Sequence, residues 1–304
     1  MKKCLKWVLA ALSILLLVGC GNQNKNGGDD ANSDEPRHYK IGVVSDRAKE
    51  IWEFALEDLE KEGDIDVEIV KFDDFIQPNK ALSEGEIDAN AYQYYTFLYD
   101  YLQDSGNKDE LYPMGYLSAE PLGIWTVDGI NSKEDIPENA QIAILNDPVN
   151  TGNALKLLDE NGLIKLKDDA PLVPTEEDIE STYKNLELVP MDYGAVPRAL
   201  GDVEMILAGS TSVTESGIDL DDAMILEDME NSNPMLRLNF VVRKEDKDNK
   251  DLQKILDAYQ RQEVIDYANE TGAGDFYGAW DNDDVPSEDM QEYADYMESH
   301  QNND

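Results

Sequence analysis

The sequence predicts an α/β fold built around a largely parallel sheet. A short apolar strand is expected at 39–44, a helix at 48–61, where apolar residues recur at helical spacing, and a second strand at 67–72. Because short connections join them, these three elements form a βαβ unit, which places two strands side by side in parallel. A chain of 304 residues allows one large domain or two smaller ones.

The same alternation of strands and helices continues along the chain. The further expected elements are a helix at 79–85, a strand at 142–145, a helix at 152–161, strands at 203–208 and 239–243, and one long helix at 252–269. Gly162 suits the end of the helix before it, because glycine readily adopts the left-handed conformation that ends many helices. The acidic segment 281–304 carries only a weak helical pattern. No repeat of 20 to 50 residues is visible.

The charge of the chain excludes nucleic acid as a partner. The sequence has 25 Lys and Arg against 66 Asp and Glu, a formal net charge of -41. Binding to an anionic polymer needs clustered basic residues, which this chain does not have. Its apolar fraction of 41% is ordinary for a globular protein, so a large core can be buried.

The first twenty residues have the order of a lipoprotein signal. Three lysines precede an apolar run at 7–18 that is short for a permanent membrane helix, which predicts a signal peptide at 1–19. The run ends in Leu-Val-Gly-Cys20, which resembles a bacterial lipobox, so Cys20 is expected to be acylated. Residues 20–37 are rich in Asn, Gly, Asp and Ser and predict a flexible tether. We therefore expect a lipid-anchored protein on the extracytoplasmic face of the cell membrane.

Processing removes Cys4 and three lysines but no acidic residue, so 22 basic residues face 66 acidic ones and the net charge becomes -44. No cysteine then remains in the folded part for a disulfide or a thiol nucleophile. A dense carboxylate surface suits a saline or alkaline medium. We expect the thermal stability of the processed protein to rise from low to high NaCl, because salt screens repulsion between like charges. A melting temperature that does not rise would contradict this hypothesis.

Catalytic motifs are missing from the sequence. It has no G-x-S-x-G elbow, no H-E-x-x-H, no P-loop and no dinucleotide fingerprint. Its two histidines, His38 and His300, lie near the ends of the predicted folded region. The acidic run 246–251 lacks the spacing of a calcium-binding loop. The sequence thus predicts a protein that is not an enzyme, with no cofactor and no metal ion.

Four stretches match a known family in order. They are Phe-Asp-Asp-Phe-Ile-Gln-Pro-Asn-Lys-Ala-Leu at 72–82, Gly-Glu-Ile-Asp-Ala-Asn at 85–90 leading to Gln93, Asn-Asp-Pro-Val-Asn-Thr-Gly-Asn-Ala-Leu at 146–155, and Asn-Gly-Leu-Ile-Lys-Leu at 161–166. Together they resemble the methionine-transport, NlpA-like lipoproteins, the substrate-binding components of methionine-type ABC importers. Matching order extends from about residue 41 to 280, nearly the whole predicted body.

The resemblance implies a two-lobed periplasmic-binding-protein-like fold, with a ligand cleft and two crossing segments near 120–121 and 233–238. Lobe one then comprises 38–120 and 238–280, lobe two 121–237, and 281–304 is an acidic C-terminal extension. The lobes would close on a small-molecule solute by a hinge motion. The implied partners are that solute, an ABC permease and, through the lipid anchor, the membrane. We expect a monomer.

Several ligand positions differ from the family pattern. Phe75 stands where the family has a tyrosine, and Tyr92 and Tyr94 stand where it has phenylalanine and histidine. The family's arginine, which grips an amino-acid carboxylate, falls on Asn153, whose amide lacks the charge and the two-pronged geometry of a guanidinium. Ser210 takes the place of an asparagine.

The last family asparagine falls between Arg237 and Asn239, because this segment is about one residue longer here. In a regular strand these two residues share one face and Leu238 points the other way. The predicted ligand-binding set is Phe75, Tyr92, Tyr94, Trp125, Asn150, Asn153, Ser210, Arg237 and Asn239.

These changes predict an amino acid or small amino-acid-like solute other than plain methionine. In one hypothesis Arg237 supplies the lost positive charge; in the other reading it is a hinge-surface residue. A second hypothesis makes Tyr92, Tyr94, Tyr95 and Trp125 an aromatic cage for a cationic or quaternary ammonium solute, with Thr151 and Ser210 orienting it or serving only as turn or cap residues. A third is an envelope lipoprotein of the family fold that has lost ligand binding.

Overall fold

The structure, a computed structural model, describes residues 36–108, 110–229, 234–280 and 284–301. The predicted signal peptide, Cys20 and the tether up to residue 35 lie outside these residues. Within the described ranges, no helix combines the length and the apolar character needed to span a membrane.

The first sheet supports lobe one and is mixed. Its strand order is β2-β1-β3-β13-β4, and β1 runs parallel to β2 and β3 whereas β13 runs antiparallel to β3 and β4. The strands are β1 (Arg37–Val43), β2 (Ile65–Lys71), β3 (Ala89–Gln93), β4 (Leu111–Tyr116) and β13 (Asn239–Arg243). The sheet is therefore completed by a strand that lies far along the chain from the other four.

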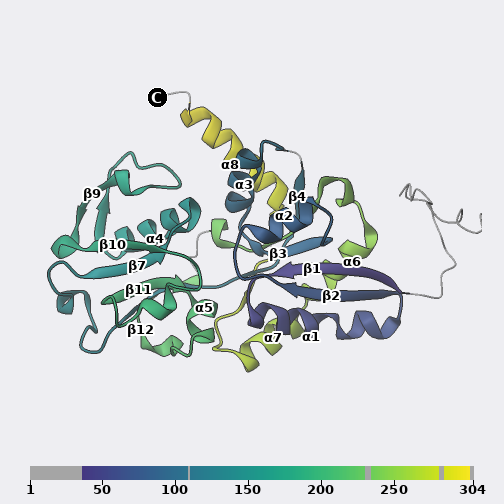
Figure 1. Cartoon of the computed structure of the whole chain (residues 1–304), viewed down its shortest axis with the longest axis horizontal. Helices are drawn as coiled ribbons and strands as arrows, with labels where there is room; N and C mark the ends of the chain where they lie inside the picture. Colours follow the sequence, from purple (N-terminus) through teal and green to yellow (C-terminus); the bar gives the residue numbers. More distant parts are fainter. Residues whose placement is uncertain (1–35, 109, 230–233, 281–283, 302–304) are drawn as a thin grey trace, which may run out of the picture. The chain divides into compact units, whose positions relative to one another are not determined.

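The second sheet supports lobe two, with strand order β10-β7-β11-β6-β12. Its strands are β6 (Leu122–Thr126), β7 (Gln141–Leu145), β10 (Glu187–Met191), β11 (Met205–Gly209) and β12 (Ala223–Leu226). Two small antiparallel pairs join β5 (Ser118–Ala119) to β14 (Tyr277–Gly278), and β8 (Ile164–Leu166) to β9 (Ile179–Thr182). Figure 1 shows the two sheets with helices packed on them.

The α-helices are α1 (Asp46–Glu62), α2 (Gln77–Ser83), α3 (Tyr95–Ser105), α4 (Pro148–Glu160), α5 (Ser210–Glu215), α6 (Lys250–Tyr259), α7 (Gln262–Thr271) and α8 (Pro286–Gln301). Single 3-10 turns occupy 133–135, 176–178, 183–185, 197–199, 220–222, 234–236 and 244–246. Each large sheet packs against its own apolar core: Trp52, Leu56 and Phe240 are central in lobe one, and Ile142, Leu155 and Leu207 in lobe two.

The predicted α/β fold with two lobes is confirmed. The chain leaves lobe one between β5 and β6, at residues 120–121, and returns between β12 and β13. Residues 230–233 of the returning segment are outside the described ranges. The exact limits of the two lobes stay a prediction.

The helix at 148–160 follows local sequence signals. Asp147 caps its first turn by accepting a hydrogen bond from the backbone N–H of Asn150 at 2.9 Å, and Pro148 occupies the first helical position. The helix thus begins four residues before the predicted 152. After its end, Gly162 has a φ of 65°, the left-handed conformation expected of it.

The single long helix predicted at 252–269 is wrong, because the chain breaks between α6 and α7. Arg261 has an extended backbone, with φ -128° and ψ 149°. Tertiary hydrogen bonds hold the break: Gln260 Nε2 donates to the carbonyl of Tyr116 at 2.7 Å, and Arg261 Nη2 donates to that of Ala55 at 2.9 Å. These partners are distant in sequence, and no proline or glycine marks the break.

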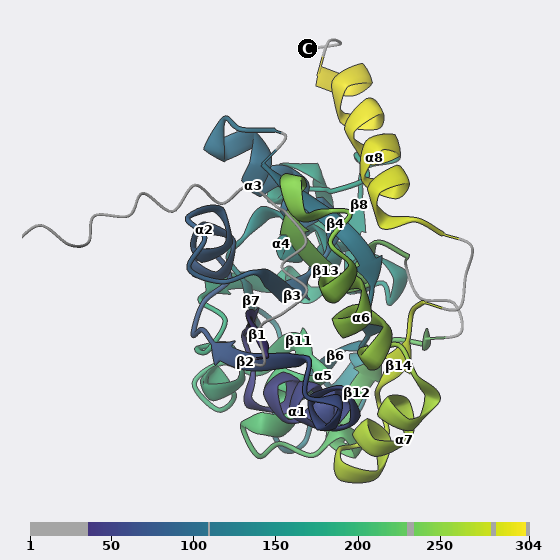
Figure 2. The same cartoon turned by 90° about the vertical axis from the view of Figure 1, so that its right-hand side faces the viewer.

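The acidic C-terminal segment forms α8, which packs on α3 and β4 (Figures 1 and 2). Tyr293 is 3% exposed and meets the rings of Tyr95 and Tyr99 edge-on. On lobe two, the backbone N–H of Leu172 donates to the Tyr296 hydroxyl at 3.0 Å. Helix α8 therefore contacts both lobes.

Candidate functional site

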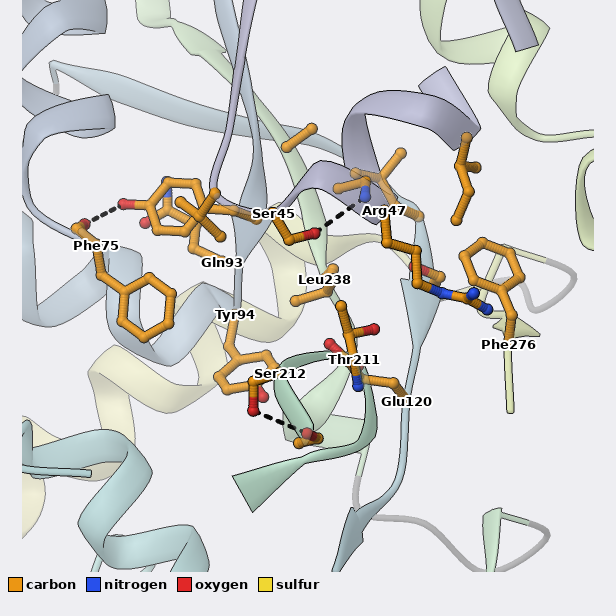
Figure 3. Close-up of a pocket in the computed structure, with 18 of the residues that line it drawn as sticks. Ser45, Arg47, Phe75, Gln93, Tyr94, Glu120, Thr211, Ser212, Leu238 and Phe276 are labelled. Atoms are coloured by element: carbon orange, nitrogen blue, oxygen red, sulfur yellow. Dashed lines mark hydrogen bonds between the residues drawn. The ribbon is translucent and has the colours of Figure 1, made fainter. Parts of the chain in front are cut away.

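A cavity of about 110 Å³ lies between the two lobes. Lobe one contributes side chains from the start of α1, from β3 and from the turn before α2, and lobe two contributes Tyr193 and the start of α5. In Figure 3, Phe75 lies at one end of the cavity and Arg47 and Phe276 lie at the other, with Tyr94 and Thr211 between them. The position corresponds to the cleft that the sequence predicts, where binding sites are common in two-lobed proteins.

The end of the cavity around Phe75 is aromatic. The Phe75 ring lies 4.6 Å from the ring of Tyr193, 5.9 Å from Tyr92 and 6.1 Å from Phe97, measured between centroids. The Tyr92 hydroxyl donates to the carbonyl of Phe75 at 2.5 Å, which holds the two residues together. Burial raises the pKa of Tyr92 and of Tyr193 well above the ordinary range, so both phenols stay neutral. This end can accept an apolar group or the face of a cation.

The opposite end carries charge. Arg47, at the start of α1, donates from Nη2 to the carbonyl of Ala268 at 3.0 Å and lies 3.4 Å from Oδ1 of the buried Asp275. Its backbone N–H donates to Oε1 of Glu215 on α5 at 2.8 Å. That bond joins the first turn of a lobe-one helix to lobe two, so the lobes touch at this end of the cavity.

Glu120 lies on the first crossing segment and faces the same end. Its Oε2 accepts the backbone N–H of Thr211 at 2.9 Å and the hydroxyl of Ser210 at 3.3 Å. Burial, with a further contribution from the negative charge of Asp275, raises the pKa of the Glu120 carboxyl. Among the described residues, no lysine, arginine or histidine forms an ion pair with it.

A network of buried amides supports the cavity wall. Asn79 Nδ2 donates to Gln93 Oε1 at 2.8 Å, and Asn79 Oδ1 accepts from Asn90 Nδ2 at 2.9 Å and from Gln93 Nε2 at 2.6 Å. Asn239 Nδ2 donates to the carbonyl of Gln93 at 3.1 Å. Gln93 lines the cavity, so this network fixes the wall on which it lies.

Four residues of the predicted binding set line this cavity: Phe75, Tyr92, Tyr94 and Asn150. Tyr94 stands just before α3, and burial raises the pKa of its phenol well above the ordinary range. Asn150 donates from Nδ2 to Asp147 Oδ2 at 2.8 Å. The structure thus brings together residues that lie about 75 positions apart in the chain.

Three other predicted residues lie around the second sheet. Trp125 is 1% exposed in the core of lobe two and donates from its indole to the carbonyl of Asp219 at 3.0 Å, so it forms no wall of the cavity. Asn153 is buried on α4 and borders a second, smaller pocket with Lys156 and Glu160; its Nδ2 has no hydrogen-bond partner among the described residues. Ser210 acts through Glu120, to which its hydroxyl donates.

The last two predicted residues flank Leu238, which does line the cavity. Arg237 forms an ion pair with Asp284 at 2.5 Å and lies over the ring of Tyr116. Asn239 is buried in the amide network, and its Oδ1 has no partner in the part of the chain that the structure describes. Ligand binding by any of the nine predicted residues stays a prediction.

Arg47, Glu120, Tyr193 and Asp275 were missed by the sequence analysis. Arg47 follows the end of β1, the place where open α/β sheets most often bind ligands, so its position was a usable signal. Glu120 belongs to a predicted crossing segment, and such a segment borders the cleft because it connects the two lobes. Tyr193 and Asp275 carried no comparable signal. Within the described ranges, no group of three or more His, Cys, Asp or Glu side chains is arranged to hold a metal ion.

Comparisons with known proteins identify the family. The sequence profile of the NlpA lipoprotein family matches residues 39–280. The D-methionine-binding lipoprotein MetQ of Escherichia coli K12 is 35% identical over 274 residues, which cover 89% of this chain and 96% of that protein. The MetQ of Yersinia pestis is 35% identical over 281 residues, covering 91% of this chain and 98% of the relative.

Solved structures agree with the sequence comparison. A crystal structure of the methionine-binding protein MetQ superposes with a TM-score of 0.74 at 33% identity, over 81% of this chain and 99% of that one. A nutrient-binding protein from Burkholderia cenocepacia, solved bound to methionine, has a TM-score of 0.74 at 28% identity, over 80% of this chain and 100% of that one. The resemblance predicted from the sequence motifs is therefore confirmed, and the chain belongs to the NlpA lipoprotein family.

Proposed function

We propose that this protein is the solute-binding lipoprotein of an ABC importer, which holds a small amino-acid-like solute between its lobes and delivers it to a membrane permease. Support comes from the relatives, which are named for binding methionine, and from the solved homologue that holds methionine. The observation that carries the proposal is the cavity between the lobes, which is aromatic at one end and charged at the other. A lobe-to-lobe contact such as Arg47 with Glu215 is the kind that hinge motion makes and breaks.

The proposed ligand is an amino acid or related solute other than plain methionine. The position of the family's carboxylate-gripping arginine is the uncharged Asn153, which does not line the cavity. Arg237 is a weak substitute, because its guanidinium is already paired with Asp284. Arg47 is the one arginine or lysine among the described cavity-lining residues.

We propose further that Cys20 carries the lipid that anchors the chain to the extracytoplasmic face of the membrane, and that the protein acts as a monomer. It binds and releases its solute without chemical change. Binding without chemical change agrees with a cavity wall whose polar groups already have hydrogen-bond partners. Gln93 is held by Asn79, and the Ser45 hydroxyl accepts the backbone N–H of Ala48.

A thermal-shift screen tests the function directly. The lipid-free protein from residue 21 is heated with amino acids, dipeptides and betaines. A solute that binds only the folded state at 100 times its Kd stabilises the protein by about 2.7 kcal/mol. We expect at least one of these classes to raise the melting temperature. A micromolar response to methionine would contradict the proposed ligand, and a silent panel would contradict solute binding and favour an envelope lipoprotein that has lost it.

Phe75→Ala provides the matched test of where the solute binds. It removes the ring at the centre of the aromatic end and is expected to abolish the shift. The adjacent Ile76 is 55% exposed and does not line the cavity, so Ile76→Ala is the control and is expected to keep the full shift. Equal loss in both variants would argue against this cavity as the binding site.

A further inference from the structure

We infer that Glu120 receives the positively charged nitrogen of the solute, and that the cavity prefers a cation without a free carboxylate over a zwitterion. The inference rests on the proposed function and names the ligand class of the same cavity. It depends on three features of the charged end: a fixed carboxylate that lines the cavity, an excess of negative charge, and a surrounding of neutral tyrosines.

The Glu120 carboxylate is fixed at a position where it lines the cavity. Its Oε2 accepts hydrogen bonds from the Thr211 N–H and from the Ser210 hydroxyl, and the Thr211 side chain contributes a further hydrogen bond to the carboxylate. All of these donors are neutral, so within the described part of the chain no protein cation offsets the charge of Glu120. An ammonium group reaching this carboxylate would make a charge-assisted hydrogen bond, which is stronger than a neutral one.

The charges around the cavity leave one negative charge without a counterpart. Arg47, Asp275 and Glu120 are the charged residues among the described ones that line it. Arg47 lies 3.4 Å from Asp275, so these two charges offset each other. A buried carboxylate without a counter-charge is unfavourable, and a ligand cation removes that cost. The carboxylate of a zwitterionic ligand would face Glu120 and Asp275, and like charges repel each other.

The tyrosines near the Glu120 carboxylate have neutral phenols. The negative charge of Glu120 contributes, after burial, to raising the pKa of Tyr94, Tyr193 and Tyr259, which places it near all three phenols. Neutral aromatic rings attract a cation through their faces. Tyr94, a member of the hypothetical aromatic cage, lines the cavity together with Tyr193, which the cage did not include, whereas Tyr95 and Trp125 of that cage do not line it.

Binding of a cation to Glu120 is expected to depend on pH. Burial and Asp275 raise the pKa of the empty site's carboxyl, and a bound cation lowers it. Protons and solute therefore compete: affinity is full above the pKa of the empty site and falls as the pH drops through it. The other charged or titratable groups that face Glu120 are Arg47, Asp275 and the phenols of Tyr94, Tyr193 and Tyr259.

Three probes with the same thioether tail separate the charge classes by isothermal titration calorimetry. They are 3-(methylthio)propylamine, a cation; methionine, a zwitterion; and N-acetylmethionine, an anion. We expect the amine to bind at least about 10-fold more tightly than methionine, a difference of about 1.4 kcal/mol, and the anion not to bind. Tighter binding of methionine or N-acetylmethionine than of the amine would overturn the inference while leaving the proposed function intact. Silence of all three and of the wider panel would overturn both.

Glu120→Gln keeps the shape of the side chain and removes its charge, and is expected to weaken the amine at least about 10-fold. Glu50→Gln is the control, because Glu50 is exposed on α1 and does not line the cavity. Unchanged amine binding in Glu120→Gln would overturn the inference. Should that variant not fold, the native protein still decides: its affinity for the amine must fall as the pH is lowered, binding must release protons, and a flat profile counts against Glu120.

Discussion

Replacing Tyr293 with alanine is expected to lower the free energy of unfolding by about 3 kcal/mol, the low end of the range for removing a large buried ring. Tyr293 is on α8 and is 3% exposed. Its ring lies 5.2 Å from that of Tyr99 and 6.2 Å from that of Tyr95, both edge-on. Edge-to-face pairs contribute beyond the burial of area, so the loss includes both contacts.

Urea unfolding followed by circular dichroism measures this change. Glu292→Ala is the matched control, because Glu292 is the preceding residue on the same helix and is exposed. We expect it to change stability by less than about 0.5 kcal/mol. A loss below 1 kcal/mol in Tyr293→Ala would mean that α8 contributes little to the folded protein.

The acidic extension as a whole is held to the body of the protein by several contacts. Residues 286–301 follow the part matched by the family profile, which ends at 280. Besides the packing of Tyr293, two hydrogen bonds connect α8 to the lobes. The Tyr116 hydroxyl donates to Asp289, and the backbone N–H of Leu172 donates to the Tyr296 hydroxyl. We therefore expect the extension to unfold together with both lobes and not as a separate tail.

Replacing Asn79 with alanine is expected to cost about 2–4 kcal/mol. Asn79 is fully buried and makes three hydrogen bonds to Gln93 and Asn90. Its removal leaves Gln93 Oε1 and Asn90 Nδ2 without those partners, and each buried polar group left unsatisfied costs about 1–3 kcal/mol. A small cavity adds to the loss.

Because Gln93 lines the ligand cavity, Asn79→Ala is also expected to weaken solute binding. The two effects are measured together by thermal unfolding without and with the solute that the screen identifies. Asn131→Ala serves as control, since Asn131 is exposed and its side chain belongs to no such network. Stability equal to that of the control would show that the amide network is dispensable.

Local patterns predicted most of the fold. The spacing of apolar residues in α1 and the cap at Asp147 depend on neighbours within a few positions, so they can be read from the chain. The break at Gln260 and Arg261 could not, because its stabilising partners, Tyr116 and Ala55, are more than 140 residues away. A helical pattern continues through that break, and tertiary hydrogen bonds override it.

The site was predicted in part, for a similar reason. Phe75, Tyr92, Tyr94 and Asn150 belong to motifs that mark a ligand cleft, and all four line the cavity. Trp125 is in none of those motifs. It was assigned by its aromatic character alone, and its side chain lies in the core of lobe two. The type of a residue does not show on which face of a sheet its side chain lies, because that depends on the register of the strand.

By itself the sequence determined the alternation of strands and helices, the excess of acidic residues and the family, because each of these depends on the composition or on contiguous residues. Only the tertiary structure decided which charges meet. Arg47, Glu120 and Asp275 belong to three distant segments and come together around one cavity after the chain has crossed twice between the lobes. Arg47 lies against Asp275, whereas Glu120 has no cationic partner among the described residues. Charge recognition depends on distances of a few ångströms, which only the folded chain sets.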